Sequence, residues 1–116
     1  MTFQLGQLVE SKGRWLKVSE LDLEVLPRMR KYLIGVAQRA QTVFYGEMKA
    51  DLDLPHPSNG LGRLLDLLSA DCIRRNEPSL AAVVVARATG EVGAAFTGDP
   101  ETERVDLREY WKGRTT

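Results

Sequence analysis

The clearest structural signal in the chain is the stretch GLGRLLDLLSADCIRRN, which occupies residues 60–76. Its apolar residues recur at the three- and four-residue spacing of one helix face: Leu61, Leu64, Leu65, Leu68 and Cys72, with Ile73 beside them. The polar residues fall largely outside this stripe: Asn59, Arg63, Asp66, Arg74 and Arg75. We therefore expect an amphipathic helix over 60–76 that hides its leucines and ends before Pro78.

A shorter helix is predicted before it, over residues 45–52. The segment Pro55-His56-Pro57-Ser58-Asn59 separates the two, because its prolines bar a helix and Ser58 or Asn59 can cap the next one. Upstream, Thr42-Val43-Phe44 is β-branched and aromatic, which predicts a short strand or an extended link. Residues 26–40 predict another helix, with Pro27 in its first turn.

After the long helix, Leu80 to Ala86 is a near-continuous apolar run and predicts a buried strand. A turn at 88–91 and a return over Val92 to Phe96 would complete a β-hairpin over 80–96. Asp99 and Pro100 are typical of a helix start, which predicts a C-terminal helix over 99–112. Its Tyr110 and Trp111 are expected to close the core against the N-terminal hairpin, with a partner-binding aromatic patch as the alternative.

The N-terminal residues 3–18 alternate weakly around the turn Ser11-Lys12-Gly13-Arg14, which predicts another β-hairpin. The order helix, short strand, helix, turn, helix, hairpin is that of a winged helix-turn-helix. We expect an α+β fold of this type, with an N-terminal β-hairpin and a C-terminal helix. One domain would cover 1–116, with an extension at 1–24, a winged-helix core at 25–98 and the final helix at 99–112.

Composition narrows the possible functions. The chain has 116 residues, with sixteen basic residues balanced by sixteen acidic ones, which argues against a large nonspecific binder of nucleic acid. Its single cysteine excludes an internal disulfide and is compatible with a reducing compartment. Because no secretory signal or membrane-spanning stretch is evident, we expect a cytoplasmic protein with no membrane partner.

Two motifs resemble a known family. TVFYGEM at 42–48 resembles the T-x-x-Y-G-E-L stretch in the DNA-binding half of alkylguanine-DNA alkyltransferases and their inactive alkyltransferase-like relatives. Val83-Val84-Val85, followed by Gly90, Gly93 and Phe96, resembles their V-V-x-x-x-G-x-x-G-x-[YF] stretch. The resemblance covers residues 42–98 and implies a DNA-binding scaffold. PSLAAVVV at 78–85, with Thr89-Gly90, more closely resembles a group of uncharacterised small bacterial proteins.

The chemistry of that family is not implied, because the alkyltransferases carry P-C-H-R before the paired valines. The cysteine position falls here at Ala81 or Ala82, and an alanine cannot act as a nucleophile. We expect Cys72 to be buried and structural, and nothing in the spacing pairs it with His56. With one cysteine and one histidine, and with Asp51 and Asp53 interpreted as a solvated loop, we predict no metal site, no cofactor and no enzymatic activity.

Two functional hypotheses rank above a third, in which the chain is an enzyme that acts through Cys72 or His56. In the first, double-stranded DNA is the partner, in a role linked to DNA repair, restriction or regulation. Ser58, Asn59 and Arg63 would then reach base edges. The other expected DNA-binding residues are Lys49, Arg74 and Arg87, with Arg39 and Arg75 as further phosphate contacts, and Tyr45 of the YGE motif.

In the second hypothesis, the same fold is a protein-interaction module that binds a larger DNA-processing enzyme. It is motivated by charge, because residues 45–58 hold one lysine and three acids, a net charge of −2, which repels phosphate.

Overall fold

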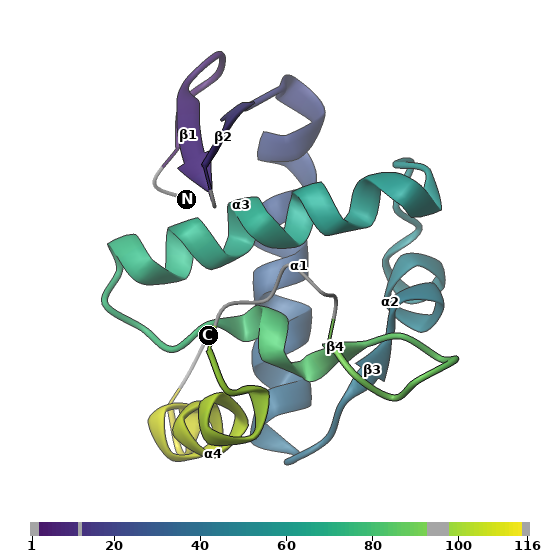
Figure 1. Cartoon of the computed structure of the whole chain (residues 1–116), viewed down its shortest axis with the longest axis vertical. Helices are drawn as coiled ribbons and strands as arrows, with labels where there is room; N and C mark the ends of the chain where they lie inside the picture. Colours follow the sequence, from purple (N-terminus) through teal and green to yellow (C-terminus); the bar gives the residue numbers. More distant parts are fainter. Residues whose placement is uncertain (1–2, 12, 93–97, 115–116) are drawn as a thin grey trace.

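The computed structural model describes residues 3–11, 13–92 and 98–114 and has an α+β architecture (Figure 1). In chain order, its elements are β1 (Leu8–Ser11), β2 (Arg14–Lys17), α1 (Glu20–Gln38), β3 (Val43–Phe44), α2 (Tyr45–Leu52), the 3₁₀ turn η1 (Ser58–Gly60), α3 (Leu61–Arg74), the 3₁₀ turn η2 (Leu80–Val83), β4 (Val84–Val85) and α4 (Pro100–Trp111). Within the described residues, no helix is long and apolar enough to cross a lipid bilayer.

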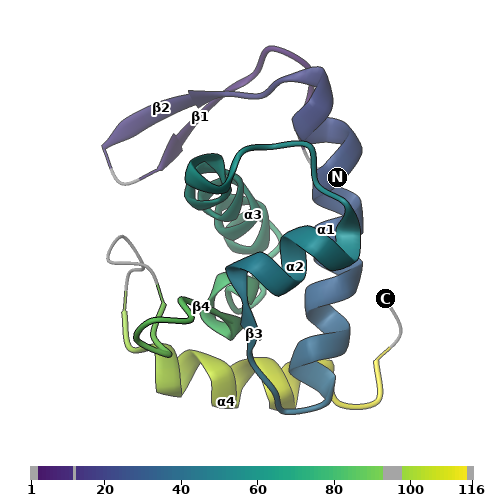
Figure 2. The ribbon, with the colours of Figure 1, turned by 90° about the vertical axis from the view of Figure 1, so that its right-hand side faces the viewer.

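The predicted N-terminal hairpin is confirmed. β1 and β2 pair antiparallel, with Val9 opposite Leu16, and both of these side chains are buried. Gly13 adopts a positive φ of 80° in the turn, a conformation that side chains with a Cβ disfavour. The hairpin packs its apolar inner face on α3 and projects its other face away from the helices (Figure 2).

α1 begins six residues earlier than the sequence predicts, at Glu20 instead of 26. The Ser19 side chain accepts a hydrogen bond from the backbone of Asp22, and the Asp22 carboxylate accepts one from the backbone of Ser19. This capping box starts the helix and leaves Pro27 inside it, a correction to the predicted first-turn position. Pro27 is exposed, and because it has no N–H, the carbonyl of Leu23 receives no i→i−4 hydrogen bond from it. Residues 20–24, predicted as part of an extension, belong to α1.

α2 matches the predicted range of 45–52, and α3 lies within the predicted 60–76. α3 occupies the middle of the molecule, with α1 running behind it (Figure 1). Its stripe of leucines is buried as expected, and Cys72 is fully buried with them. Leu67, outside the predicted stripe, is buried as well, and so is Asp66, whose carboxylate binds Arg14 of the hairpin.

The predicted hairpin over 80–96 is corrected in its first half. Leu80–Val83 form a 3₁₀ turn, and β4 pairs parallel with β3, with Val43 opposite Val84 and Phe44 opposite Val85. Every residue from Leu80 to Val85 is buried, and a fully buried apolar run carries no periodicity that distinguishes a strand from a turn. A tight turn follows, in which the N–H of Ala86 donates to the carbonyl of Glu91. The predicted return strand at 92–96 lies outside the described residues except for Val92, which is not in a strand.

α4 starts as predicted, with the Asp99 side chain accepting a hydrogen bond from the backbone of Glu101. The sequence predicts that α4 packs against the N-terminal hairpin. In the structure it packs instead against α1 and η2 (Figures 1 and 2). Trp111 is buried there, and Tyr110 meets it edge-on with ring centroids 4.9 Å apart. The buried core runs as one cluster from Phe3 to Trp111.

Candidate functional site

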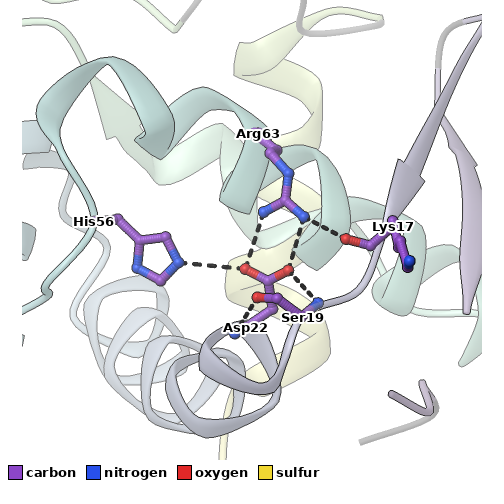
Figure 3. Close-up of polar contacts among 5 residues, drawn as sticks. All are labelled: Lys17, Ser19, Asp22, His56 and Arg63. Atoms are coloured by element: carbon purple, nitrogen blue, oxygen red, sulfur yellow. Dashed lines mark hydrogen bonds and ion pairs between the residues drawn. The ribbon is translucent and has the colours of Figure 1, made fainter. Parts of the chain in front are cut away.

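A polar cluster lies where the start of α3 meets the start of α1 (Figure 3). The guanidinium of Arg63 donates to both carboxylate oxygens of Asp22, at 2.9 and 2.8 Å, and to the backbone carbonyl of Lys17 at 2.6 Å. Asp22 is 0% exposed, so its charge has no access to water and depends on these donors. The cluster joins β2, α1 and α3 through one buried carboxylate.

The environment of Asp22 fixes its ionisation. Burial alone acts to raise the pKa of Asp22, but the hydrogen bonds from the Arg63 side chain and from Ser19 outweigh it and lower the pKa to about 2. The same pairing raises the pKa of Arg63 further above its ordinary value. Both groups are therefore charged at neutral pH, and the pair forms a permanent ionic link.

His56 completes the cluster, with its Nε2 atom 3.3 Å from the Asp22 carboxylate. Its side chain is 11% exposed, and its Nδ1 atom is buried without a hydrogen-bond partner among the described residues. Through its Nε2 atom, His56 links the turn before α3 to the carboxylate of Asp22.

Two predicted DNA-binding residues are engaged in internal contacts. Arg63 is bound to Asp22, and Lys49 donates from Nζ to the backbone carbonyls of Leu54 and His56, at 2.8 and 2.6 Å. These contacts satisfy carbonyl groups of the turn that precedes α3. The expectation that Arg63 points freely outward is corrected, because the buried carboxylate of Asp22 holds its guanidinium.

The other predicted DNA-binding residues lie at separate places. Asn59 is exposed just before α3, Arg74 is exposed at the end of α3 with its guanidinium 5.1 Å from the Phe3 ring, and Arg87 lies over the Phe44 ring at 4.4 Å. Tyr45 is partly buried at the start of α2, and Ser58 begins η1, with its side chain outside the described structure.

Asn59 and Arg74 do not converge. A helix rises 1.5 Å per residue, so the length of α3 separates them by roughly 20 Å. Of the two further predicted phosphate contacts, Arg39 donates to the side chain of Gln41 and Arg75 pairs with Asp71. The predicted set therefore includes residues at opposite ends of α3 and arginines that neighbouring side chains already bind.

The thiol of Cys72 lies in the core, on the buried face of α3. Burial raises the pKa of the Cys72 thiol to about 11, so the thiolate is scarce at neutral pH. Ala81 and Ala82, at the position of the alkyltransferase cysteine, are buried in η2. Among the described residues, no group of three or more His, Cys, Asp or Glu side chains lies close enough to hold a metal ion.

A feature that the sequence analysis missed lies at the other end of α3. An open groove of about 650 Å³ separates the end of α3 from α4, and its walls combine apolar and acidic side chains: Ile73, Asn76, Glu77, Pro78, Glu103, Asp106, Glu109 and Tyr110. Ile73 is 73% exposed there. None of the described lining residues is basic.

The acids of the groove differ in what they bind. Arg30 donates to both oxygens of Glu77, at 2.7 and 3.0 Å, and Glu103 accepts the backbone N–H of Ser79 at 2.6 Å. Asp106 and Glu109 are exposed on α4, one helical turn apart. The available signal was the three-residue spacing that runs from Glu103 to Asp106 and from Asp106 to Glu109, since residues at i and i+3 share one helix face.

Comparisons of the chain with protein-family models, with curated proteins and with solved structures found no match. The resemblance to alkyltransferase-like proteins therefore rests on the motif residues alone.

Proposed function

We propose that this chain is a non-enzymatic protein-interaction module whose groove between the end of α3 and α4 holds a basic segment of a larger partner. The observation that carries this proposal is the composition of the groove, whose described lining residues include an exposed isoleucine and four acids but no base. Its surface therefore complements a segment that offers cations around an apolar side chain.

The apolar part of the groove provides the first argument. Ile73 is the most exposed of the large hydrophobic side chains in the described residues. It lies on α3, the most apolar of the described helices, yet its side chain is outside the core. Pro78 and Tyr110 line the same groove. Removing this surface from water would contribute about 25 cal/mol per Å² to binding.

The charged part provides the second argument. Asp106 and Glu109 are exposed, and no ion pair of either is found among the described side chains. Lysine or arginine side chains of a partner would approach them without breaking an internal salt bridge. DNA-processing enzymes carry basic segments for their own contact with phosphates, so an enzyme of this class is the partner we expect.

The cations of the chain support a protein partner over DNA. Five arginines are paired with carboxylates: Arg14 with Asp66, Arg30 with Glu77, Arg63 with Asp22, Arg75 with Asp71, and Arg104 with Glu101. An arginine already bound to a carboxylate contributes little to phosphate neutralisation.

A titration followed by amide NMR shifts tests the groove, with acetyl-Lys-Lys-Leu-Lys-Lys-amide as the probe. We expect shifts around Ile73 and Tyr110, and about tenfold weaker binding in the Asp106→Lys, Glu109→Lys double variant. Glu24→Lys, an exposed charge reversal on α1, is the matched control and should bind like the parent chain. Shifts confined to other surfaces, or equal binding by the double variant, would reject the proposal.

The second candidate function is DNA binding, by a winged helix-turn-helix similar in scaffold to alkyltransferase-like proteins. The surface near the starts of α3 and α2 favours it. Asn59 is exposed before α3, whose N-terminus has no side-chain cap, and Arg87 is exposed beside the start of α2. Uncapped backbone N–H groups at a helix start favour phosphate, and asparagine can read adenine.

Fluorescence anisotropy with duplex DNA at low salt separates the two candidates. DNA binding requires association at micromolar protein that falls several-fold in Asn59→Ala and Arg87→Ala and is unchanged in the Asp106→Lys, Glu109→Lys variant. If the chain binds the basic peptide but does not bind duplex DNA at micromolar protein, only the protein-interaction function is supported.

A further inference from the structure

The outer face of the β1–β2 hairpin exposes two large apolar side chains. Trp15 is 67% exposed and Leu8 is 58% exposed, whereas their strand neighbours Val9 and Leu16 point into the core. Glu10 and Lys17 share the outer face with them. A tryptophan and a leucine exposed on the same small face mark a contact site more often than isolated apolar residues do.

The strand register fixes how these four side chains are arranged. Leu8 lies opposite Lys17, and Glu10 lies opposite Trp15. The face is thus a four-cornered patch, with the two apolar residues on one diagonal and the two opposite charges on the other. Figure 3 shows the Lys17 side chain pointing away from the Asp22 cluster, which uses only the backbone carbonyl of Lys17.

From this arrangement we propose that the hairpin face binds the same face of a second copy of the chain. When two such patches meet about a two-fold axis along the apolar diagonal, Leu8 meets its own copy and Trp15 meets its own copy. The same rotation exchanges the two ends of the charged diagonal. Glu10 of each copy therefore lies over Lys17 of the other copy. The patch is therefore self-complementary in both hydrophobicity and charge, as an isologous interface requires.

The alternative two-fold axis, along the charged diagonal, is disfavoured. It would place Glu10 against Glu10 and Lys17 against Lys17, and like charges in contact oppose association. Charge thus selects one orientation of the two copies. This surface is separate from the groove at the end of α3, so its test does not depend on the proposed function.

The size of the patch sets the expected strength. Four side chains cover far less than the roughly 800 Å² per partner of a standard interface, so we expect a dissociation constant of about 0.1–1 mM. Leu5 adds apolar surface beside Lys17, where both line a shallow groove of about 490 Å³. Association at this strength appears when the chain is concentrated locally, for example by a shared partner.

Charge reversal tests the pairing, with self-association measured by sedimentation equilibrium up to about 1 mM protein. Glu10→Lys and Lys17→Glu should each weaken self-association at least about tenfold, because each places like charges in contact. An equimolar mixture of the two variants should associate like the parent chain, since every contact is again between opposite charges. The double variant, which carries both reversals, should also self-associate.

Two controls keep the result specific. Lys31→Glu reverses an exposed charge on α1 and should leave self-association unchanged. Thermal unfolding of each variant checks that the hairpin remains folded, and Trp15→Ser should abolish association without a large change in melting temperature. A parent chain that remains monomeric at about 1 mM, or a mixture that associates no better than the single variants, would overturn the proposal.

Discussion

Acidic residues lie at both ends of α3, but they are buried and paired at its start and exposed at its end. At its start, Asp22 is buried and receives donors from Arg63, Ser19 and His56. At its end, Asp106 and Glu109 are exposed beside a groove whose described walls hold no base.

The comparison indicates that Asp22 contributes to folding, whereas Asp106 and Glu109 are available for binding. A carboxylate removed from water destabilises the fold unless its oxygens are paired, so Asp22 is tied to several elements at once. A carboxylate left in water carries no such requirement and remains available to a partner. Substitutions at the start of α3 should therefore act on stability, and substitutions at its end on recognition.

The largest effect is expected from Asp22→Asn, which leaves Arg63 without its anionic partner and weakens the start of α1. We expect the free energy of unfolding to fall by about 3 kcal/mol. Urea denaturation measures the change, and Glu24→Gln, at an exposed position of the same helix, should stay within about 0.5 kcal/mol of the parent chain. A loss below about 1 kcal/mol in Asp22→Asn would contradict the role assigned to the buried pair.

The contribution of Asp22 should also appear in the pH dependence of the free energy of unfolding. Because the folded-state pKa of Asp22 is lowered to about 2, its contribution is present above the pKa of the unfolded chain and is lost as the pH falls towards about 2. The lowered pKa corresponds to about 2 kcal/mol. Urea denaturation between pH 5 and about 2 should therefore show a smaller decline in Asp22→Asn than in the parent chain; parallel curves would rule out this linkage.

The smallest effect on stability is expected at the other end of the helix. Ile73→Ser should change the free energy of unfolding by less than about 0.5 kcal/mol, because the side chain is mostly exposed. Leu68→Ala, buried on the same helix, is the contrast and should cost about 3 kcal/mol. A large loss in Ile73→Ser would show that the groove stabilises the fold and would weaken its assignment as a binding surface.

Much of this fold follows from local patterns. The leucine spacing predicts α3, the proline-rich turn predicts the break before it, and Asp99-Pro100 predicts the start of α4. Pro27, a residue typical of a first turn, predicts that α1 starts at 26, whereas the capping box of Ser19 and Asp22 starts the helix at Glu20. The apolar run 80–86 predicts a strand, but its first half forms the 3₁₀ turn η2, because burial by surrounding elements leaves no local pattern that distinguishes the two.

The candidate site was harder to predict because it depends on contacts distant in sequence. Arg63 is an outward residue by helix periodicity, yet Asp22 reaches it from α1. The groove requires the end of α3 and α4 to face each other, and no motif encodes that approach. Cys72, by contrast, was predicted to be buried, because its environment is set by its own helix.

The parallel pairing of β3 with β4 has a consequence for how the chain folds. It joins positions roughly forty residues apart, and α2 and α3 lie on the loop that it closes. Two residue pairs alone cannot compensate for the entropy of that closure, so the bridge depends on helices that are already docked. We expect the helices to nucleate folding and the small sheet to join last.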